Sequence, residues 1–99
     1  MKQITESDRL LKTLGDRLRV ARLERNDTMA TFAERLGVSE RTVRAMEQGL
    51  PTVQIGTWLA ALWILNALEP LDGVLAPRES LLDRARSARA PRRRASRRQ

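Results

Sequence analysis

The sequence predicts an all-α fold of four or five short helices followed by a basic tail. Apolar residues recur at helical spacing in several segments, clusters of Gly, Asn, Asp and Pro separate those segments, and no stretch alternates convincingly as a strand would. We therefore expect one compact domain over residues 1–76 and a flexible Arg-rich tail over residues 77–99.

The first helix is expected over about residues 7–25. It ends at Asn26 and Asp27, which break the periodic pattern. Its apolar stripe consists of Leu10, Leu14, Leu18 and Ala21, flanked by Leu11 and Leu23.

Two shorter helices, over residues 29–36 and 40–48, are joined by a tight turn. Gly37 fits the exit from the first because positive φ is cheap without a side chain, and Ser39 is a natural N-cap for the second. Ala33 is small where the two helices cross. The apolar contacts come from Phe32, Leu36, Val38, Val43 and Met46.

The outward positions of the second helix are Glu40, Arg41, Arg44, Ala45 and Gln48. This pattern predicts a DNA-binding helix-turn-helix, and the alternative is an ordinary helical hairpin.

Residues 28–49, TMATFAERLGVSERTVRAMEQG, resemble the helix-turn-helix of Cro and phage repressors, the XRE family. The identical positions are Thr28, Ala33, Gly37, Val38, Ser39, Thr42, Glu47 and Gly49. The chain departs at Met29, where the family usually has a Gln that touches a DNA phosphate, although the helix N-terminus still offers backbone N–H groups. The resemblance implies a compact lambda-repressor-like domain.

The fourth helix, expected over residues 55–65, reads IGTWLAALWIL and is apolar on nearly all sides. Such a helix must be covered on more than one face. We expect one face to complete the core and the other to contact a second copy or another partner, since helix-turn-helix modules commonly act as dimers. The interface residues expected there are Trp58, Leu59, Leu62 and Trp63. The alternative is that the rest of the chain covers both faces. Asn66 can end this helix, and residues 67–71 can form one more turn before Pro70 and Gly73 interrupt.

Residues 49–65 also resemble a segment of small regulators encoded beside HipA-like serine/threonine kinases. The matching positions are Gly49, Pro51, Val53, Gly56, Thr57, Leu62, Trp63 and Leu65. This resemblance implies a HipB-type antitoxin, which represses its own operon and binds a HipA-like kinase toxin. Two alternatives are a stand-alone phage or host regulator and a helical interaction module that has lost DNA binding.

The resemblance also implies roles for single residues. Arg41 or Arg44 fits a guanine, because the guanidinium fork matches O6 and N7. Glu40 either accepts from a cytosine amino group or stabilises the helix N-terminus. Thr28 and Thr42 either reach phosphates or serve capping and packing. The full set of expected DNA contacts is Thr28, Met29, Ser39, Glu40, Arg41, Thr42, Arg44, Ala45 and Gln48. A structural ion pair between the first and third helices is expected from Arg22 and Glu47.

The net charge of +7 lies entirely in the tail. Residues 1–76 carry ten basic and ten acidic side chains, whereas residues 77–99 carry nine Arg and two acids. This tail has three interpretations: an arm on DNA, a strap on the toxin, or a solvated extension. We favour the arm on DNA, because clustered Arg raises affinity by counterion release.

The composition narrows the function classes. The chain has no Cys and no His, which excludes disulfides, thiolate metal sites and the familiar catalytic triads. We expect no enzyme activity, cofactor or metal. The polar N-terminus is unlike a signal peptide, and the apolar run over residues 58–65 is too short to span a bilayer, so we expect a cytoplasmic, nucleoid-associated protein.

Overall fold

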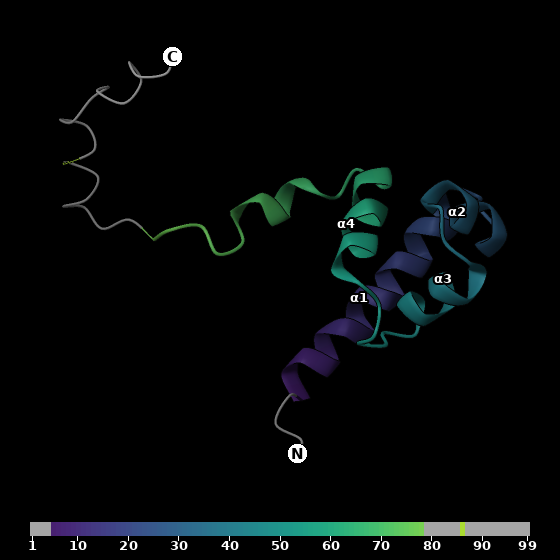
Figure 1. Cartoon of the computed structure of the whole chain (residues 1–99), viewed down its shortest axis with the longest axis horizontal. Helices are drawn as coiled ribbons and strands as arrows, with labels where there is room; N and C mark the ends of the chain where they lie inside the picture. The colour runs from purple at the N-terminus through teal and green to yellow at the C-terminus, as the bar shows by residue number, and fades with distance from the viewer. Residues whose placement is uncertain (1–4, 79–85, 87–99) are drawn as a thin grey trace, which may run out of the picture.

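The computed structural model describes residues 5–78 and residue 86. All regular structure in this part is helical: α1 (Thr5–Glu24), α2 (Met29–Leu36), α3 (Glu40–Glu47), α4 (Ile55–Ile64) and the 3₁₀ helix η1 (Glu69–Gly73). The helix α3 contacts both α1 and α2, and α2 also contacts α4 (Figure 1). The predicted all-α class is confirmed over these residues. Of the predicted tail, all but Pro77, Arg78 and Arg86 lies outside the described residues.

The helix ends follow the local stop signals. The bounds of α2 are those predicted, α1 begins two residues earlier than expected, and α1, α3 and α4 each end one residue early. Asn26 and Asn66, which follow α1 and α4, both have φ of 61°. Asparagine tolerates this left-handed conformation better than most residues. The further turn expected over residues 67–71 is instead the 3₁₀ helix η1. Pro70 lies near the start of η1 and does not interrupt it, because the first residues of a helix need no N–H donor.

The turn between α2 and α3 has the predicted chemistry. Gly37 adopts φ of 76°, and its N–H donates to the carbonyl oxygen of Glu34 at 3.2 Å. Ser39 caps α3, since its Oγ accepts a hydrogen bond from the N–H of Thr42 at 3.1 Å. These two local contacts set the direction in which α3 leaves the turn.

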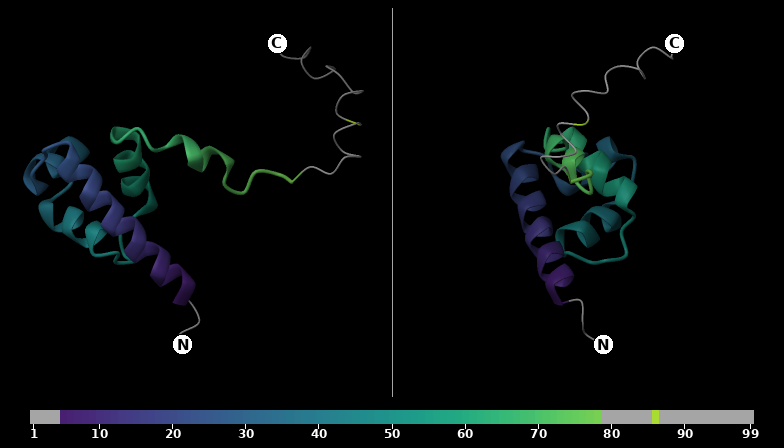
Figure 2. Two further views of the ribbon diagram at one scale, coloured as in Figure 1. Left: turned by 180° about the vertical axis from the view of Figure 1, so that it is seen from behind. Right: turned by 90° about the vertical axis from the view of Figure 1, so that its left-hand side faces the viewer.

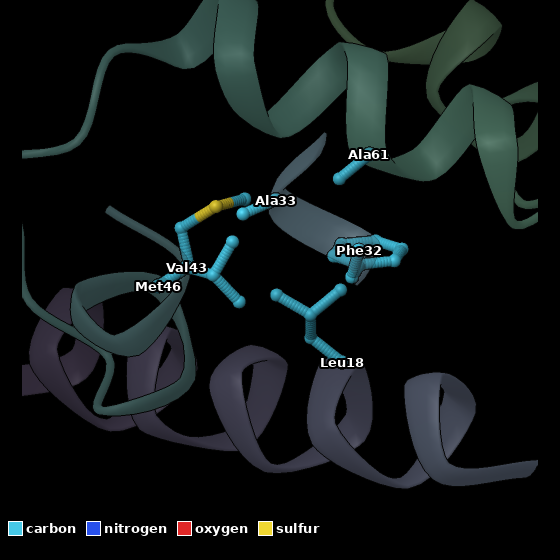
Figure 3. Close-up of a cluster of buried hydrophobic side chains, with 6 residues drawn as sticks. All are labelled: Leu18, Phe32, Ala33, Val43, Met46 and Ala61. Atoms are coloured by element: carbon cyan, nitrogen blue, oxygen red, sulfur yellow. The ribbon is translucent and has the colours of Figure 1, made fainter. Parts of the chain in front are cut away.

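A small core lies where α1, α2, α3 and α4 meet (Figure 3). Its buried members are Leu18, Phe32, Ala33, Val43, Met46 and Ala61. Leu36 and Val38 pack against this cluster without being fully buried. The expected stripe on α1 is only partly right, because Leu10 remains 50 % exposed. It lies toward the N-terminal end of α1, which extends beyond the other helices (Figure 1).

The backbones of α1 and of the end of α3 lie in direct contact. A Cβ on Gly15 would be 2.6 Å from the carbonyl oxygens of both Met46 and Glu47. A Cβ on Gly49 would be 2.8 Å from the Cα of Lys12, and Gly49 also has a φ of 74°. Both sites therefore require glycine, and together they fix the position of the end of α3 on α1.

Candidate nucleic-acid interface

A buried ion pair fastens α3 to α1. Arg22 and Glu47 expose only 7 % and 6 % of their side chains. The guanidinium donates from Nε to Glu47 Oε2 at 2.6 Å and from Nη2 to Oε1 at 3.1 Å. This bidentate hydrogen bond raises the pKa of Arg22 above its ordinary value, despite the opposing effect of burial. The structure thus contains the pair that the sequence resemblance implied.

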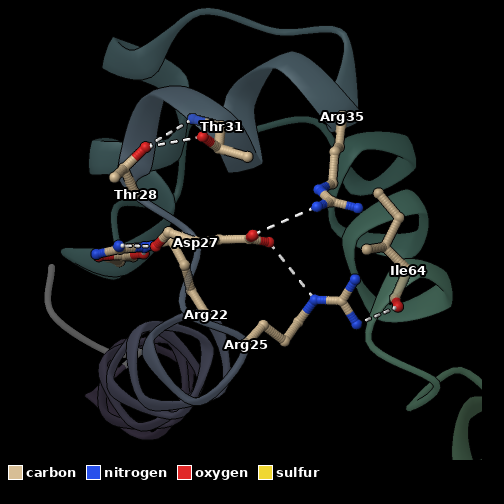
Figure 4. Close-up of polar contacts among 8 residues, drawn as sticks. Arg22, Arg25, Asp27, Thr28, Thr31, Arg35 and Ile64 are labelled. Carbon is tan, nitrogen blue, oxygen red and sulfur yellow. Dashed lines mark hydrogen bonds and ion pairs between the residues drawn. The ribbon is translucent and has the colours of Figure 1, made fainter.

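A second charged cluster holds the loop between α1 and α2 (Figure 4). The carboxylate of Asp27, 6 % exposed, pairs with Arg25 Nε at 3.5 Å and with Arg35 Nη2 at 3.4 Å. The backbone carbonyl of Asp27 accepts from Arg22 Nη1 at 2.9 Å, and Arg25 Nη1 donates to the carbonyl of Ile64 at 3.4 Å. This cluster connects the ends of α1 and α4 with α2. In the sequence pattern, Asp27 indicated only a helix breaker.

The exposed side of α3 forms one wall of an open hollow of about 660 Å³. Five of the expected DNA contacts line it, namely Arg41, Thr42, Arg44, Ala45 and Gln48. Arg41, Arg44 and Gln48 are exposed, whereas Thr42 and Ala45 are partly buried. The hollow therefore presents two guanidinium groups and an amide together, which are the groups that read the edges of guanine and adenine.

The other expected contacts do not line the hollow. Thr28 caps α2, accepting from the N–H of Thr31 at 3.0 Å, and Met29 is partly buried against the core. Ser39 caps α3 and shares a 3.2 Å hydrogen bond with the hydroxyl of Thr42. Glu40 is exposed in the first turn of α3, where a carboxylate stabilises the helix N-terminus. Three of these residues thus have structural roles in the chain itself.

Comparison with protein families agrees with this geometry. Residues 13–71, more than half of the chain, match the model of a helix-turn-helix domain. The chain belongs to this helix-turn-helix family. It is therefore a DNA-binding regulator, in which α2, the turn at Gly37 and α3 are the motif. A search of curated proteins found no relative that matches the chain.

Three further polar residues of the helix-turn-helix domain line the hollow and were not among the predicted DNA contacts. Thr52 and Gln54 lie in the connection between α3 and α4, and Thr57 lies in the first turn of α4. The Gln54 side chain makes no capping bond to α4. The pattern predicted only a loop after Gly49, and nothing in its spacing shows that this loop returns along α3.

Much of α4 in the helix-turn-helix domain is exposed or only partly buried. Trp58, Leu59 and Leu62 line an apolar groove, whereas Trp63 lies outside it with 70 % of its surface exposed. Only Ala61 of this helix is fully buried. Three of the four expected interface residues thus line the groove, and the fourth, Trp63, is exposed to solvent. In residues 5–78, no helix combines the length and apolar character that a membrane crossing requires.

Proposed function

We propose that the protein is a sequence-specific transcriptional repressor that binds operator DNA as a homodimer. The hollow beside α3 carries this proposal, because it gathers Arg41, Arg44 and Gln48 on the exposed side of the second helix of the motif. The Arg22–Glu47 pair holds that helix against α1. A rigidly supported helix with exposed Arg is what base reading in a major groove needs.

Within the interface, Arg41 and Arg44 select the sequence. Each presents a guanidinium fork that matches guanine O6 and N7. Gln48 lies further along the same wall and fits adenine N6 and N7. Glu40 either accepts from a cytosine amino group or stabilises the N-terminus of α3. Thr28, Met29, Ser39, Thr42 and Ala45 complete the proposed contact surface.

We propose further that the repressor is a HipB-type antitoxin acting in the cytoplasm, and that its partner is a HipA-like kinase toxin. Support comes from the sequence resemblance over residues 49–65 and from the exposed Trp63, since Trp is enriched at interface centres. The alternative is a stand-alone XRE-family regulator. Both proposals share the DNA interface and differ only in the partner of α4.

A gel-shift titration with the chain's own promoter tests the DNA proposal. Arg41→Ala and Arg44→Ala should each cost about 1–3 kcal/mol, which is a 5- to 150-fold loss of affinity. Arg19→Ala is the matched control, because Arg19 is an exposed Arg of α1 that does not line the hollow. If all three variants bind the promoter with unchanged strength and selectivity, α3 is not the reading helix.

Co-expression with the neighbouring gene tests the antitoxin proposal. A HipA-like kinase encoded beside this chain should co-purify with it and lose its toxicity to growing cells. Trp63→Ser should weaken that co-purification, whereas Arg44→Ala should leave it intact. A neighbouring gene of another kind, or a kinase that remains toxic and unbound, would leave the stand-alone regulator as the function.

A further inference from the structure

An apolar groove of about 320 Å³ is lined by none of the proposed DNA contacts of α3, although it shares Leu50 and Val53 with the hollow. Its walls come from α1, from the connection between α3 and α4, from α4 itself and from η1. The lining residues that matter here are Leu11, Leu14, Ile55, Trp58, Leu62 and Leu71. Every residue that lines the groove is apolar. Such a surface is unfavourable in water and favours an apolar segment as its occupant.

The same chain carries an apolar segment that the domain does not bury. After α4, residues 69–76, here called the arm, lead away from the helices (Figures 1 and 2). Val74 and Leu75 on this arm are 59 % and 96 % exposed. Leu71 of the arm lines the groove of its own chain, whereas Val74 and Leu75 do not.

We propose that two copies of the chain associate by exchanging arms, so that Val74 and Leu75 of each copy enter the apolar groove of the other. This inference rests on the homodimer of the proposed function and assigns its contact surface. A two-fold axis makes the same contact twice, which is why one complementary pair of features on one chain suffices.

The length of the connection limits how closely the two copies must approach for this exchange. Four residue steps join Leu71 to Leu75; two lie in η1 and rise about 2.0 Å each, and the other two span at most about 3.3 Å each, so Leu75 reaches about 11 Å from Leu71. An exchange that keeps η1 therefore requires the partner's groove to lie within about that distance of Leu71.

One observation favours a second copy over an unrelated protein. Both halves of the contact, the groove and the exposed Val74 and Leu75, are present in one chain, and the described residues leave both uncovered.

Cysteine cross-linking tests the exchange directly, because the chain has no natural Cys. Ile55→Cys in the groove and Leu75→Cys on the arm replace exposed residues, at 75 % and 96 % exposure. When the two single variants, carrying tags of different size, are mixed and mildly oxidised, we expect a disulfide-linked heterodimer as the main product. Val20→Cys mixed with Leu75→Cys is the control, since Val20 is 53 % exposed on α1 and does not line the groove.

Other cross-linking patterns would overturn the exchange. Predominant Ile55→Cys homodimers would place groove against groove, and predominant Leu75→Cys homodimers would place arm against arm. Equal yields with Val20→Cys would show random collision. A wild-type chain that is monomeric alone, but whose groove binds a kinase-like neighbour, would assign the groove to that partner instead.

Sedimentation equilibrium gives a second and independent measurement. Val74→Ser and Leu75→Ser should raise the dimer dissociation constant about tenfold or more, whereas Val20→Ser should leave it unchanged. An unchanged dissociation constant in both arm variants would overturn the exchange. The promoter gel shift separates this result from the proposed function: a cross-linked dimer that binds no promoter refutes the repressor and keeps the arm contact.

Discussion

The helices α3 and α4 are of similar length and lie on the same core, but their outward sides differ in chemistry. In α3, Val43 and Met46 are fully buried and the opposite side presents Arg41 and Arg44. In α4, Ala61 alone is fully buried, and the opposite side presents apolar residues, with Trp63 70 % exposed. The polar outer side of α3 is favourably hydrated, whereas exposing the apolar outer side of α4 to water costs free energy.

This difference separates two kinds of recognition on one small domain. A polar, cationic helix face can remain solvated until phosphates and base edges replace the water. Covering an exposed apolar face with another protein surface lowers the free energy, because it removes that face from water. We infer that α3 meets nucleic acid and that the side of the domain containing α4 meets protein.

The largest expected effect comes from breaking the buried ion pair that joins α3 to α1. Glu47→Ala leaves the buried guanidinium of Arg22 without its bidentate partner, so the free energy of unfolding should fall by about 3–5 kcal/mol. Urea unfolding followed by circular dichroism measures this change. Glu6→Ala is the control, since the Glu6–Arg9 pair is exposed and should contribute about 0.5 kcal/mol or less. Equal losses in both variants would contradict the anchoring role.

A smaller loss is expected from separating α3 and α1 at Gly15. Gly15→Ala places a Cβ against two backbone carbonyl oxygens that cannot move aside as a side chain would, so unfolding should become easier by about 1–3 kcal/mol. In α4, Gly56→Ala meets no atom within 4 Å and should be neutral or stabilising. Thermal unfolding of the two variants compares them. A neutral Gly15→Ala would mean that the two backbones are not in contact.

Removing the basic tail tests whether the tail supplies nonspecific attraction to DNA while α3 selects the sequence. Ending the chain at Ala76 removes nine Arg, so the slope of log affinity against log salt should flatten by about 0.9 for each DNA phosphate that the tail neutralises. Operator and random DNA should be affected alike, because the change concerns phosphates. Filter binding at several salt concentrations measures the slope. An unchanged slope would assign all phosphate binding to the domain.

The smallest effect on stability is expected at the outer side of α4. Trp63→Ser should change the free energy of unfolding by about 0.5 kcal/mol or less at concentrations where the chain is monomeric, because this Trp is mostly exposed. Denaturant titrations at two protein concentrations make the measurement. A loss well above 1 kcal/mol in the monomer would mean that other residues of the same chain cover this face.

The features that could be predicted from the sequence are those that local physics determines. Gly37 and Ser39 show their roles within a few residues, since a left-handed exit and an N-cap involve only neighbouring backbone. The Arg22–Glu47 pair could be predicted only from a family resemblance, because its partners are 25 positions apart in the sequence.

The features that could not be predicted all depend on contacts between distant segments. Gly15 resembles an ordinary helix position until the end of α3 is placed against it. Asp27 resembles a simple helix breaker until Arg25 and Arg35 converge on it. Leu10 has the correct periodicity for a buried stripe, but among the described helices the N-terminal end of α1 extends beyond the others, and Leu10 is 50 % exposed (Figure 1). Periodicity identifies a helix face but not the length over which that face is covered.

The backbone contact of α1 with the end of α3 has a consequence for how the binding preference can change. Gly15, Arg22, Glu47 and Gly49 position α3 on α1, and none of them lines the hollow. Arg41, Arg44 and Gln48, which do line it, take no part in that support. Exchanging those three side chains should therefore redirect the domain to another DNA sequence while its fold is inherited unchanged.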